Sequence, residues 1–231
     1  MITFRKLIKR ILDLIIALLL LVPAIIFSMV VGILIKLDSP GPVYYKQKRY
    51  GKNNKPFVMY KFRTMFVDAD KQQAMLQAKN EATGFLFKMT IDPRQTNIGR
   101  SLRNTGVDEI PQIFNVLKGE MSLVGPRPLP INDVDFDELK KQPDLNNQWE
   151  MRTKVRPGIT GLWQINPGNH SFANMLDLDE EYVNNFSLRT DFEIISKTAQ
   201  MALSSIFPNF IRNPKNGSKK IDNKLEIVNK K

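Results

Sequence analysis

An uncharged apolar segment near the start of the chain constrains its fold more than any other feature. No residue from Leu14 to Ile35 carries a charge, which is a run of 22 residues. A helix of this length could just cross a hydrocarbon core of about 30 Å. The run is too long for the apolar part of a cleaved signal peptide, and no small-residue cleavage site precedes Lys36. The sequence therefore predicts a membrane helix.

The flanks of this segment and its proline indicate how the helix meets the membrane. Basic residues lie on both sides of it: Arg5, Lys6, Lys9 and Arg10 before, and Lys36, Lys46, Lys48 and Arg49 after. Because basic residues near membrane ends favour the cytoplasm, two basic flanks oppose a crossing. Pro23, near the middle, removes a backbone hydrogen bond and kinks a helix. We therefore expect residues 1–38 to form a re-entrant helix that breaks at Pro23 and returns to the cytoplasmic face; a spanning helix is the alternative.

Composition narrows the class of protein further. The chain has no cysteine and one histidine, which excludes disulfides, thiolate chemistry and a histidine-rich metal site. Its net charge of +11 is concentrated at the ends, with +4 in residues 1–10 and +5 in residues 212–231. A basic end beside an apolar run predicts attraction to anionic membrane lipids. Since no basic stripe interleaved with aromatic residues crosses the middle of the chain, we expect no nucleic-acid partner.

The rest of the chain is predicted to be a small α+β domain. About 170 residues suit one domain with a modest core, so we assign residues 39–211 to a mostly helical cytoplasmic domain with short strands and amphipathic interfacial helices. Residues 212–231 are predicted to be a basic, disordered tail. Strands are expected at Val43–Lys48, Phe57–Phe62 and Met121–Val124, the first two forming a hairpin. Helices are expected at Asp68–Lys79, Ile98–Arg103, Glu109–Lys118, Asn132–Lys141, Ser171–Asn185 and Leu188–Phe207.

The adjacent carboxylates Asp108 and Glu109 are the first candidate for chemistry. On their own they fit an N-capping Asp followed by a first-turn Glu, which is a common stabilising pattern. At a helix start Asp108 would stay ionised, which suits nucleophilic attack better than proton donation. Glu109 offers a hard oxygen ligand of the kind that Mg²⁺ prefers. Two acids in a basic chain therefore indicate chemistry on a phosphate.

Several cations are candidates to neutralise that phosphate. Lys61 and Arg63 lie at the end of a predicted strand, and Arg103 precedes the acidic pair. Arg127 stands between Pro126 and Pro128, which stiffen its backbone and favour a pre-organised contact with an anion. Guanidinium groups bind phosphate oxygens strongly, so these side chains are the predicted phosphate-binding residues.

Seven segments in order carry a resemblance to a known family. They are Lys9–Asp13, the apolar run, Asp38–Val43, Tyr60–Met65, Asp108–Gly119, Met121–Pro128 and Arg156–Gln164. Together they resemble the bacterial sugar transferase family, the monotopic phosphoglycosyl transferases, also called undecaprenyl-phosphate sugar phosphotransferases. The likeness extends from Lys9 to about Ser204. The chain is similar to the minimal, single-domain form of that family.

The resemblance implies a specific reaction. Members of the family transfer a sugar-1-phosphate from a UDP-sugar to undecaprenyl phosphate and release UMP, as the first membrane step of exopolysaccharide, capsule or glycoconjugate synthesis. By the same resemblance Asp108 would be the nucleophile that forms a covalent phosphosugar intermediate, and Glu109 would bind Mg²⁺. Arg103 and Arg127 match family positions that contact phosphate. The enzyme would act at the cytoplasmic face of the bacterial cell membrane, and a homo-oligomer is compatible with the sequence.

Two departures from the family pattern and several alternatives accompany this hypothesis. Relatives often have Ser-Pro at the helix break, where this chain has Val22-Pro23. A Gly-Arg pair that commonly follows the Trp-Gln segment is absent after Gln164. The sequence leaves the sugar open between a hexose and an N-acetylated amino sugar. The alternative from another class is a non-catalytic membrane-surface scaffold of a glycan assembly complex.

Overall fold

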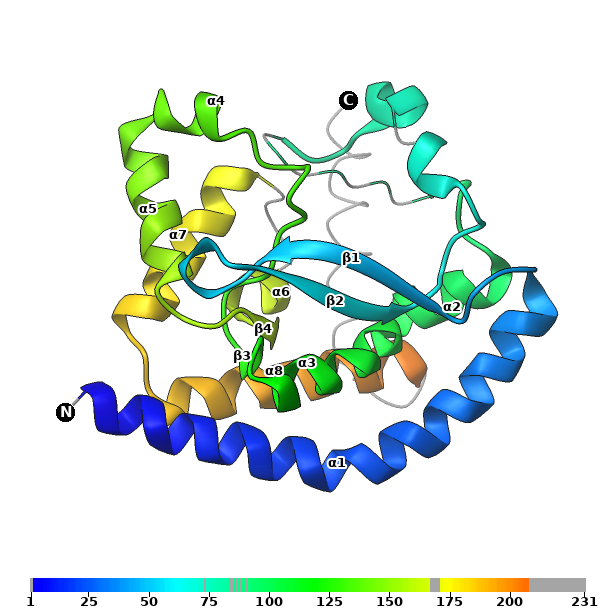
Figure 1. Cartoon of the computed structure of the whole chain (residues 1–231), viewed down its shortest axis with the longest axis horizontal. Coiled ribbons are helices and arrows are strands. Elements are labelled where there is room, and N and C mark those ends of the chain that lie inside the picture. Colours follow the sequence, from blue (N-terminus) through cyan, green and yellow to red (C-terminus); the bar gives the residue numbers. More distant parts are fainter. Residues whose placement is uncertain are drawn as a thin grey trace, which may run out of the picture.

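The computed structural model of the chain describes residues 2–72, 74–83, 85, 87, 89, 91–166 and 171–207. It is a mixed helix and strand fold in which helices predominate, as the α+β prediction requires (Figure 1). The tail predicted for residues 212–231 lies outside the described residues. The α-helices are α1 Ile2–Asp38, α2 Asn97–Thr105, α3 Ile113–Lys118, α4 Phe136–Lys140, α5 Pro143–Thr153, α6 Leu162–Ile165, α7 Phe172–Asn184 and α8 Leu188–Ile206. The strands are β1 Tyr44–Tyr50, β2 Pro56–Phe62, β3 Ser122–Val124 and β4 Gly158–Thr160.

Helix α1 is one long helix with Pro23 inside it. Figure 1 shows that it bends near its middle and that the rest of the molecule lies on its concave side. Within the described part of the chain it is the one helix long and apolar enough to cross a membrane. Its outer face stays exposed, with Leu19 72% and Leu37 80% accessible. A continuous apolar surface of this kind marks contact with lipid or with another protein.

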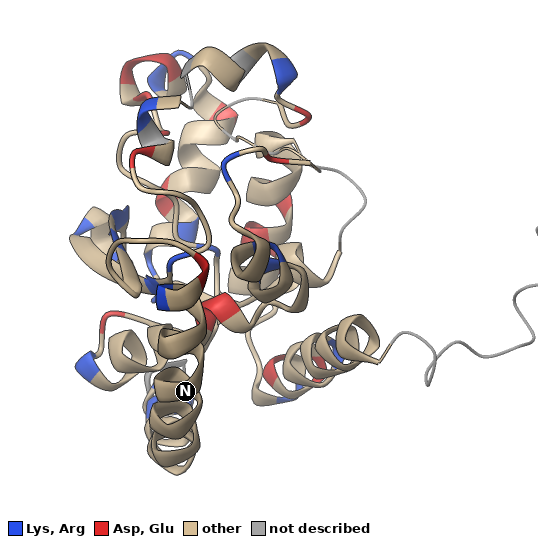
Figure 2. Ribbon diagram, turned by 90° about the vertical axis from the view of Figure 1, so that its right-hand side faces the viewer, with Lys and Arg blue, Asp and Glu red and all other residues tan. Residues whose placement is uncertain are grey.

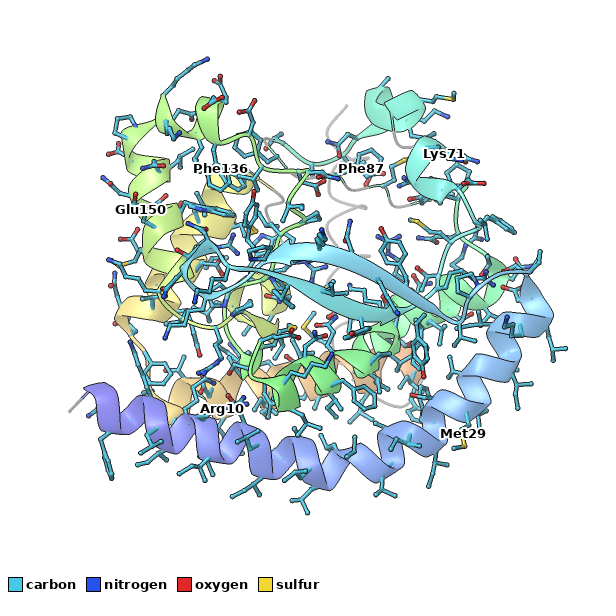
Figure 3. The ribbon with its side chains drawn as sticks, viewed as in Figure 1. Arg10, Met29, Lys71, Phe87, Phe136 and Glu150 are labelled. Carbon is cyan, nitrogen blue, oxygen red and sulfur yellow. The ribbon has the colours of Figure 1, made fainter. Side chains whose placement is uncertain are left out.

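The inner face of α1 packs against the domain along its whole length. Small and branched residues are buried there at helical spacing: Ala17, Ala24, Val31 and Ile35. Figure 3 shows the two faces, with Arg10 directed toward the body of the molecule and Met29 on the outer side. The domain therefore rests on both halves of the bent helix.

The first half of α1 is held by polar contacts. Lys9 Nζ lies 2.7 Å from Asp191 Oδ2 in α8, and Arg10 Nη1 donates to Val116 O in α3 at 2.9 Å. The Asp13 carboxylate is buried, accepting from Ser122 Oγ at 2.7 Å. These contacts join the first half of α1 to the start of α8, to α3 and to β3. In Figure 2 α1, marked by the N, and α8, which leads into the grey trace, both lie in the lower part of the molecule.

The second half of α1 is held mainly by apolar packing. Val31 and Ile35 form a buried cluster with Phe62 and Leu102. At the end of the helix Asp38 Oδ2 accepts from the backbone N–H of Ile98 at 3.0 Å. That N–H belongs to the first turn of α2, where a carboxylate is favoured by the helix dipole.

A β-hairpin and a parallel strand pair complete the support for the site. Strands β1 and β2 pair antiparallel, from Tyr44 opposite Phe62 to Tyr50 opposite Pro56, which confirms the predicted hairpin. The buried Asn115 of α3 ties the hairpin down, because its amide accepts from Tyr60 N and donates to Val58 O. Strand β3 pairs in parallel with β4.

Three parts of the expected pattern differ from the structure. The segment Asp68–Lys79 forms the 3₁₀ turns η2 Ala69–Gln72 and η3 Ala74–Lys79 and no α-helix over its described residues. Among its described side chains Ala69 alone is buried and Met75 is 85% exposed, and helices draw most of their stability from a packed apolar face. The helix expected at Asn132–Lys141 is shortened to α4, and α5, α6 and β4 were not predicted. Helix α5 is polar over most of its surface, so its sequence carries little helical periodicity.

Candidate active site

The Asp108-Glu109 pair lies just after α2, where the chain turns back toward the hairpin. Gly106, with a φ of +73°, ends α2 in the left-handed conformation. The chain then enters the 3₁₀ turn η4 Val107–Gln112, and α3 begins only at Ile113. The expected single helix from Glu109 to Lys118 is thus wrong in its first four residues, because Pro111 disfavours the α conformation at the preceding Ile110. Its predicted end is confirmed, since Gly119 adopts a φ of +83° as the C-cap.

One large cleft opens beside the acidic pair. Its volume is about 780 Å³, and both Asp108 and Glu109 line it. Three of the four predicted phosphate-binding residues also line it: Lys61 from β2, Arg103 from α2, and Arg127 from the segment after β3. Side chains from four separate parts of the sequence therefore meet around the two carboxylates.

The fourth predicted phosphate-binding residue, Arg63, does not line this cleft. Its guanidinium group is buried and turned toward the end of α1, where it donates to Ser39 O at 2.6 Å and to Pro40 O at 2.7 Å. It also donates to Ser39 Oγ at 2.9 Å. Arg63 thus binds the turn that follows α1. Its place at the end of a predicted strand gave no indication of this contact.

Lys61 and Arg127 converge on Glu109. Lys61 Nζ lies 2.5 Å from Glu109 Oε1, and Arg127 Nη1 lies 3.6 Å from the same oxygen. Lys61 Nζ is farther from the other acid, at 3.9 Å from Asp108 Oδ2. The cations thus lie closer to the carboxylate of Glu109 than to that of Asp108.

This asymmetry separates the two acids electrostatically. Burial acts to raise the pKa of Glu109, but Lys61 and Arg127 outweigh it and hold that pKa at about 2. Burial raises the pKa of Asp108 above its usual range, and the attraction of Lys61 does not fully offset it. The negative charge of Glu109 adds to the rise. Glu109 is therefore a permanent anion, whereas Asp108 is a desolvated and more basic carboxylate.

The backbone of Arg127 is held by two arginines that the sequence analysis missed. Arg152 Nη2 donates to Arg127 O, and Arg152 Nε lies 2.8 Å from Asp179 Oδ2 in a fully buried ion pair. On the other side Arg49 Nη1 donates to Pro128 O at 2.5 Å. These contacts add to the stiffening expected from the flanking prolines. They connect residues up to 79 positions apart, so no local motif points to them.

Two residues besides Arg49 also line the cleft and escaped sequence reasoning, Trp163 and Gln164. Arg49 lines it, and its burial beside Arg127 lowers its own pKa to about 10. The ring of Trp163 lies under the Arg127 guanidinium, 5.7 Å from ring centroid to Cζ. Next to it, neither polar atom of the buried Gln164 amide has a hydrogen-bond partner among the described residues. A buried amide is costly when unpaired, so Gln164 is suited to hydrogen-bond a ligand in the cleft.

The acidic pair offers few ligands for a metal ion. Among the described residues no three His, Cys, Asp or Glu side chains form a metal-binding group. Mg²⁺ commonly takes only one or two protein carboxylates and completes its shell with water and substrate phosphates. Glu109, with Asp108 beside it, fits that mode of binding and does not fit an all-protein cage.

Comparison with known proteins gives consistent matches. The model of the bacterial sugar transferase family matches residues 4–205. The galactosyl transferase CpsE of Streptococcus agalactiae is 43% identical over 71% of this chain, and the exopolysaccharide production protein ExoY of Sinorhizobium fredii is 38% identical over 82%. The UDP-glucose:undecaprenyl-phosphate glucose-1-phosphate transferase of Escherichia coli is 36% identical over 84% of the chain.

The extent of these matches differs between relatives. The aligned part is 83% of ExoY but only 35% of CpsE and 39% of the Escherichia coli protein. The chain thus spans about a third of the length of CpsE. The family match, in contrast, covers nearly all of the described structure, including the bent helix, the hairpin and the cleft. The chain belongs to the bacterial sugar transferase family.

Proposed function

We propose that this protein transfers a sugar-1-phosphate from a UDP-sugar to undecaprenyl phosphate and releases UMP. The observation that carries the proposal is the cleft in which a buried Asp108 lies beside Glu109, Lys61, Arg103 and Arg127. The names of relatives supply the substrates, since the Escherichia coli protein is named as a transferase from UDP-glucose to undecaprenyl phosphate. Other relatives are named for galactose or N-acetylgalactosamine, so the sugar stays open.

In the proposed first step Asp108 is the nucleophile. A carboxylate oxygen of Asp108 attacks the phosphorus that carries the sugar, and the bond from that phosphorus to the bridging oxygen breaks. UMP leaves with the bridging oxygen, and the sugar phosphate stays bound to Asp108 as an acyl phosphate. The raised pKa of Asp108 supports this role, because a more basic, less solvated carboxylate is a better nucleophile.

In the second step the acceptor replaces the carboxylate. A phosphate oxygen of undecaprenyl phosphate attacks the same phosphorus, and the bond from phosphorus to Asp108 breaks. The product is a lipid diphosphate sugar, and Asp108 returns as a carboxylate. Lys61, Arg103 and Arg127 are placed to neutralise the phosphate oxygens in both steps, which lowers the repulsion between anions.

Glu109 is the residue that would hold Mg²⁺. The ion, when bound, would neutralise charge on the diphosphate of the donor. In this proposal Glu109 shares its carboxylate between the ion and the cations Lys61 and Arg127. Its pKa of about 2 keeps it anionic at neutral pH.

We further propose that α1 is re-entrant and that the site faces the cytoplasm. The domain contacts α1 from Lys9 at one end to Asp38 at the other. A helix that crossed a bilayer would carry this polar domain into the hydrocarbon core, at a high cost in desolvation. A bent helix that dips into one leaflet leaves the domain in water and brings the cleft to the level of the lipid phosphates.

The reaction is tested with purified protein, Mg²⁺, undecaprenyl phosphate and a set of UDP-sugars. We expect UMP release with one donor, and formation of the lipid-linked sugar. Asp108→Asn should release none. If folded protein in lipid released no UMP from any nucleotide sugar, the proposed reaction would be wrong and the scaffold alternative would replace it.

The placement of α1 is tested by cysteine labelling, since the natural chain has no cysteine. Arg5 and Lys55 lie on either side of the uncharged run Leu14–Ile35 and are both exposed, so Arg5→Cys and Lys55→Cys should both react with a water-soluble reagent from the cytoplasmic side. Leu19→Cys is a matched control: it is 72% exposed in the protein alone and should be shielded by lipid. Labelling of Arg5→Cys from the opposite side would make α1 a spanning helix.

A further inference from the structure

A second cavity lies at the other end of the molecule and shares no lining residue with the catalytic cleft. It has a volume of about 90 Å³, room for a few water-sized groups, and lies beside the first turns of α1. Six cations line it, and we call it the basic pocket. They are Lys6, Lys9, Arg10, Lys52, Lys154 and Arg156.

The basic pocket is built on anchored side chains. Arg10 Nη1 donates to Val116 O, and Arg156 Nε donates to Gly119 O at 2.8 Å. Both guanidinium groups are therefore held in fixed positions, close to each other, at the carbonyl end of α3. Lys9 is also fixed, through its ion pairs with Asp13 and Asp191.

The charge of the basic pocket is only partly compensated. Asp13 is the one carboxylate that lines it, and that carboxylate already contacts Lys9 and accepts from Ser122. Lys6, Lys52 and Lys154 come from three separate segments and are exposed at its rim. A group with several anionic oxygens would satisfy these cations, as a phosphate does.

The position of the pocket identifies the source of that phosphate. The exposed apolar residues Phe4, Leu7 and Ile11 lie on the same turns of α1 as Lys6 and Arg10. Acyl chains can therefore lie along the outer face of α1 while a headgroup reaches the pocket. Basic pockets beside membrane helices recognise anionic lipids in this way.

We propose that the basic pocket binds the phosphate headgroup of an anionic glycerophospholipid and thereby fixes the first half of α1 at the membrane surface. This rests on the proposed placement of α1 in the membrane but not on the proposed reaction. The pocket is separate from the cleft, so the lipid bound here is a structural ligand and not a substrate.

The test uses the full chain in nanodiscs of phosphatidylcholine and phosphatidylglycerol, released into neutral detergent and analysed by native mass spectrometry. We expect phosphatidylglycerol to be retained preferentially. Lys52→Gln/Lys154→Gln should weaken that preference about thirty-fold, since each lysine near a lipid phosphate contributes about fivefold. The control Lys140→Gln/Lys141→Gln removes two exposed lysines of α4 and its C-cap and should change nothing. An equal loss in both variants, or none in either, would overturn the proposal.

A competition arm separates a lipid from a soluble anion. Short-chain phosphatidylglycerol should displace the retained lipid, and inorganic phosphate at the same concentration should not. Displacement by inorganic phosphate alone would overturn the assignment to a lipid. The Lys52→Gln/Lys154→Gln variant should still release UMP at the normal rate in detergent, and Asp108→Asn should still retain the lipid, so that a failure of the reaction and a failure of the lipid site are distinguished.

Discussion

The catalytic cleft and the basic pocket both gather cations, but they differ in what those cations face. In the cleft Lys61 and Arg127 contact the carboxylate of Glu109, with Asp108 buried beside it. In the basic pocket Arg10 and Arg156 donate to backbone carbonyls, and the carboxylate of Asp13 is already engaged by Lys9 and Ser122. The acidic pair of the cleft is suited to chemistry on phosphate, whereas the basic pocket is suited to hold a phosphate that does not react.

The largest expected effect comes from removing Asp108, the proposed nucleophile. Asp108→Asn should lower UMP release by about 10³-fold or more, because an amide cannot replace the anionic oxygen. Asp133→Asn is the matched control, since Asp133 lines the same cleft but has no part in the proposed reaction. Steady-state UMP release by both variants is the measurement. Similar losses in the two would mean that the cleft tolerates no change of charge and that Asp108 has no special role.

Glu109→Gln should have the next largest effect. We expect a fall in rate of about 10²-fold, the size found when one electrostatic contact to a reacting phosphate or oxyanion is lost. Because Glu109 is the proposed ligand, the concentration of Mg²⁺ that gives half-maximal rate should also rise. A titration with Mg²⁺ that gave the same midpoint as the natural protein would place the ion elsewhere.

The two neighbours of Asp108 should shift the pH profile in opposite directions. Asp108 must be ionised to attack, so the rate falls as the pH falls through its raised pKa. The charge of Glu109 raises that pKa, so Glu109→Gln should move the acid limb to lower pH. The charge of Lys61 lowers it, so Lys61→Met should move the limb to higher pH.

Profiles of kcat/KM against pH for the two variants test whether the acid limb shifts in opposite directions. Glu109 itself, with a pKa of about 2, contributes no limb in the accessible range. Lys52→Met is the control for Lys61→Met, since Lys52 lies in the basic pocket and should leave the profile unchanged. Shifts of Glu109→Gln and Lys61→Met in the same direction would contradict the electrostatic account.

The smallest expected effect is that of Gln164. Gln164→Leu removes the buried amide at the cleft wall, and we expect about a tenfold loss in kcat/KM with the fold unchanged. The half-buried Gln148 of α5 does not line the cleft and is the control, as Gln148→Leu should have no effect on the rate. Equal rates for the natural protein and Gln164→Leu would mean that water, and not the substrate, satisfies this amide.

Much of the site could be predicted from sequence because its signals are local. The acidic pair, the prolines around Arg127 and the strand that carries Lys61 are each read within a few residues, and the structure brings these residues to one cleft. Arg63 followed the same local pattern but lies one residue beyond the end of β2 and binds the turn after α1, so its position in the sequence did not place it correctly.

The features that sequence reasoning missed depend on contacts across the fold. Arg152 reaches both Asp179 and the carbonyl of Arg127, and the pairing of α5 with α7 that creates this contact has no sequence motif. The 3₁₀ turn at η4 is local, and Pro111 was the signal for it, because a proline disfavours the α conformation at the residue before it. The bend of α1 was signalled by Pro23, which removes a backbone hydrogen bond inside the helix.

The central claim is that Asp108 carries the sugar phosphate between donor and acceptor. The most direct measurement is the intact mass of the protein after incubation with the UDP-sugar donor and no undecaprenyl phosphate. We predict a gain equal to one sugar phosphate, mapped to Asp108, with one UMP released per protein and the adduct lost when the acceptor is added. UMP release that requires the acceptor, with no adduct at any time, would contradict the covalent mechanism.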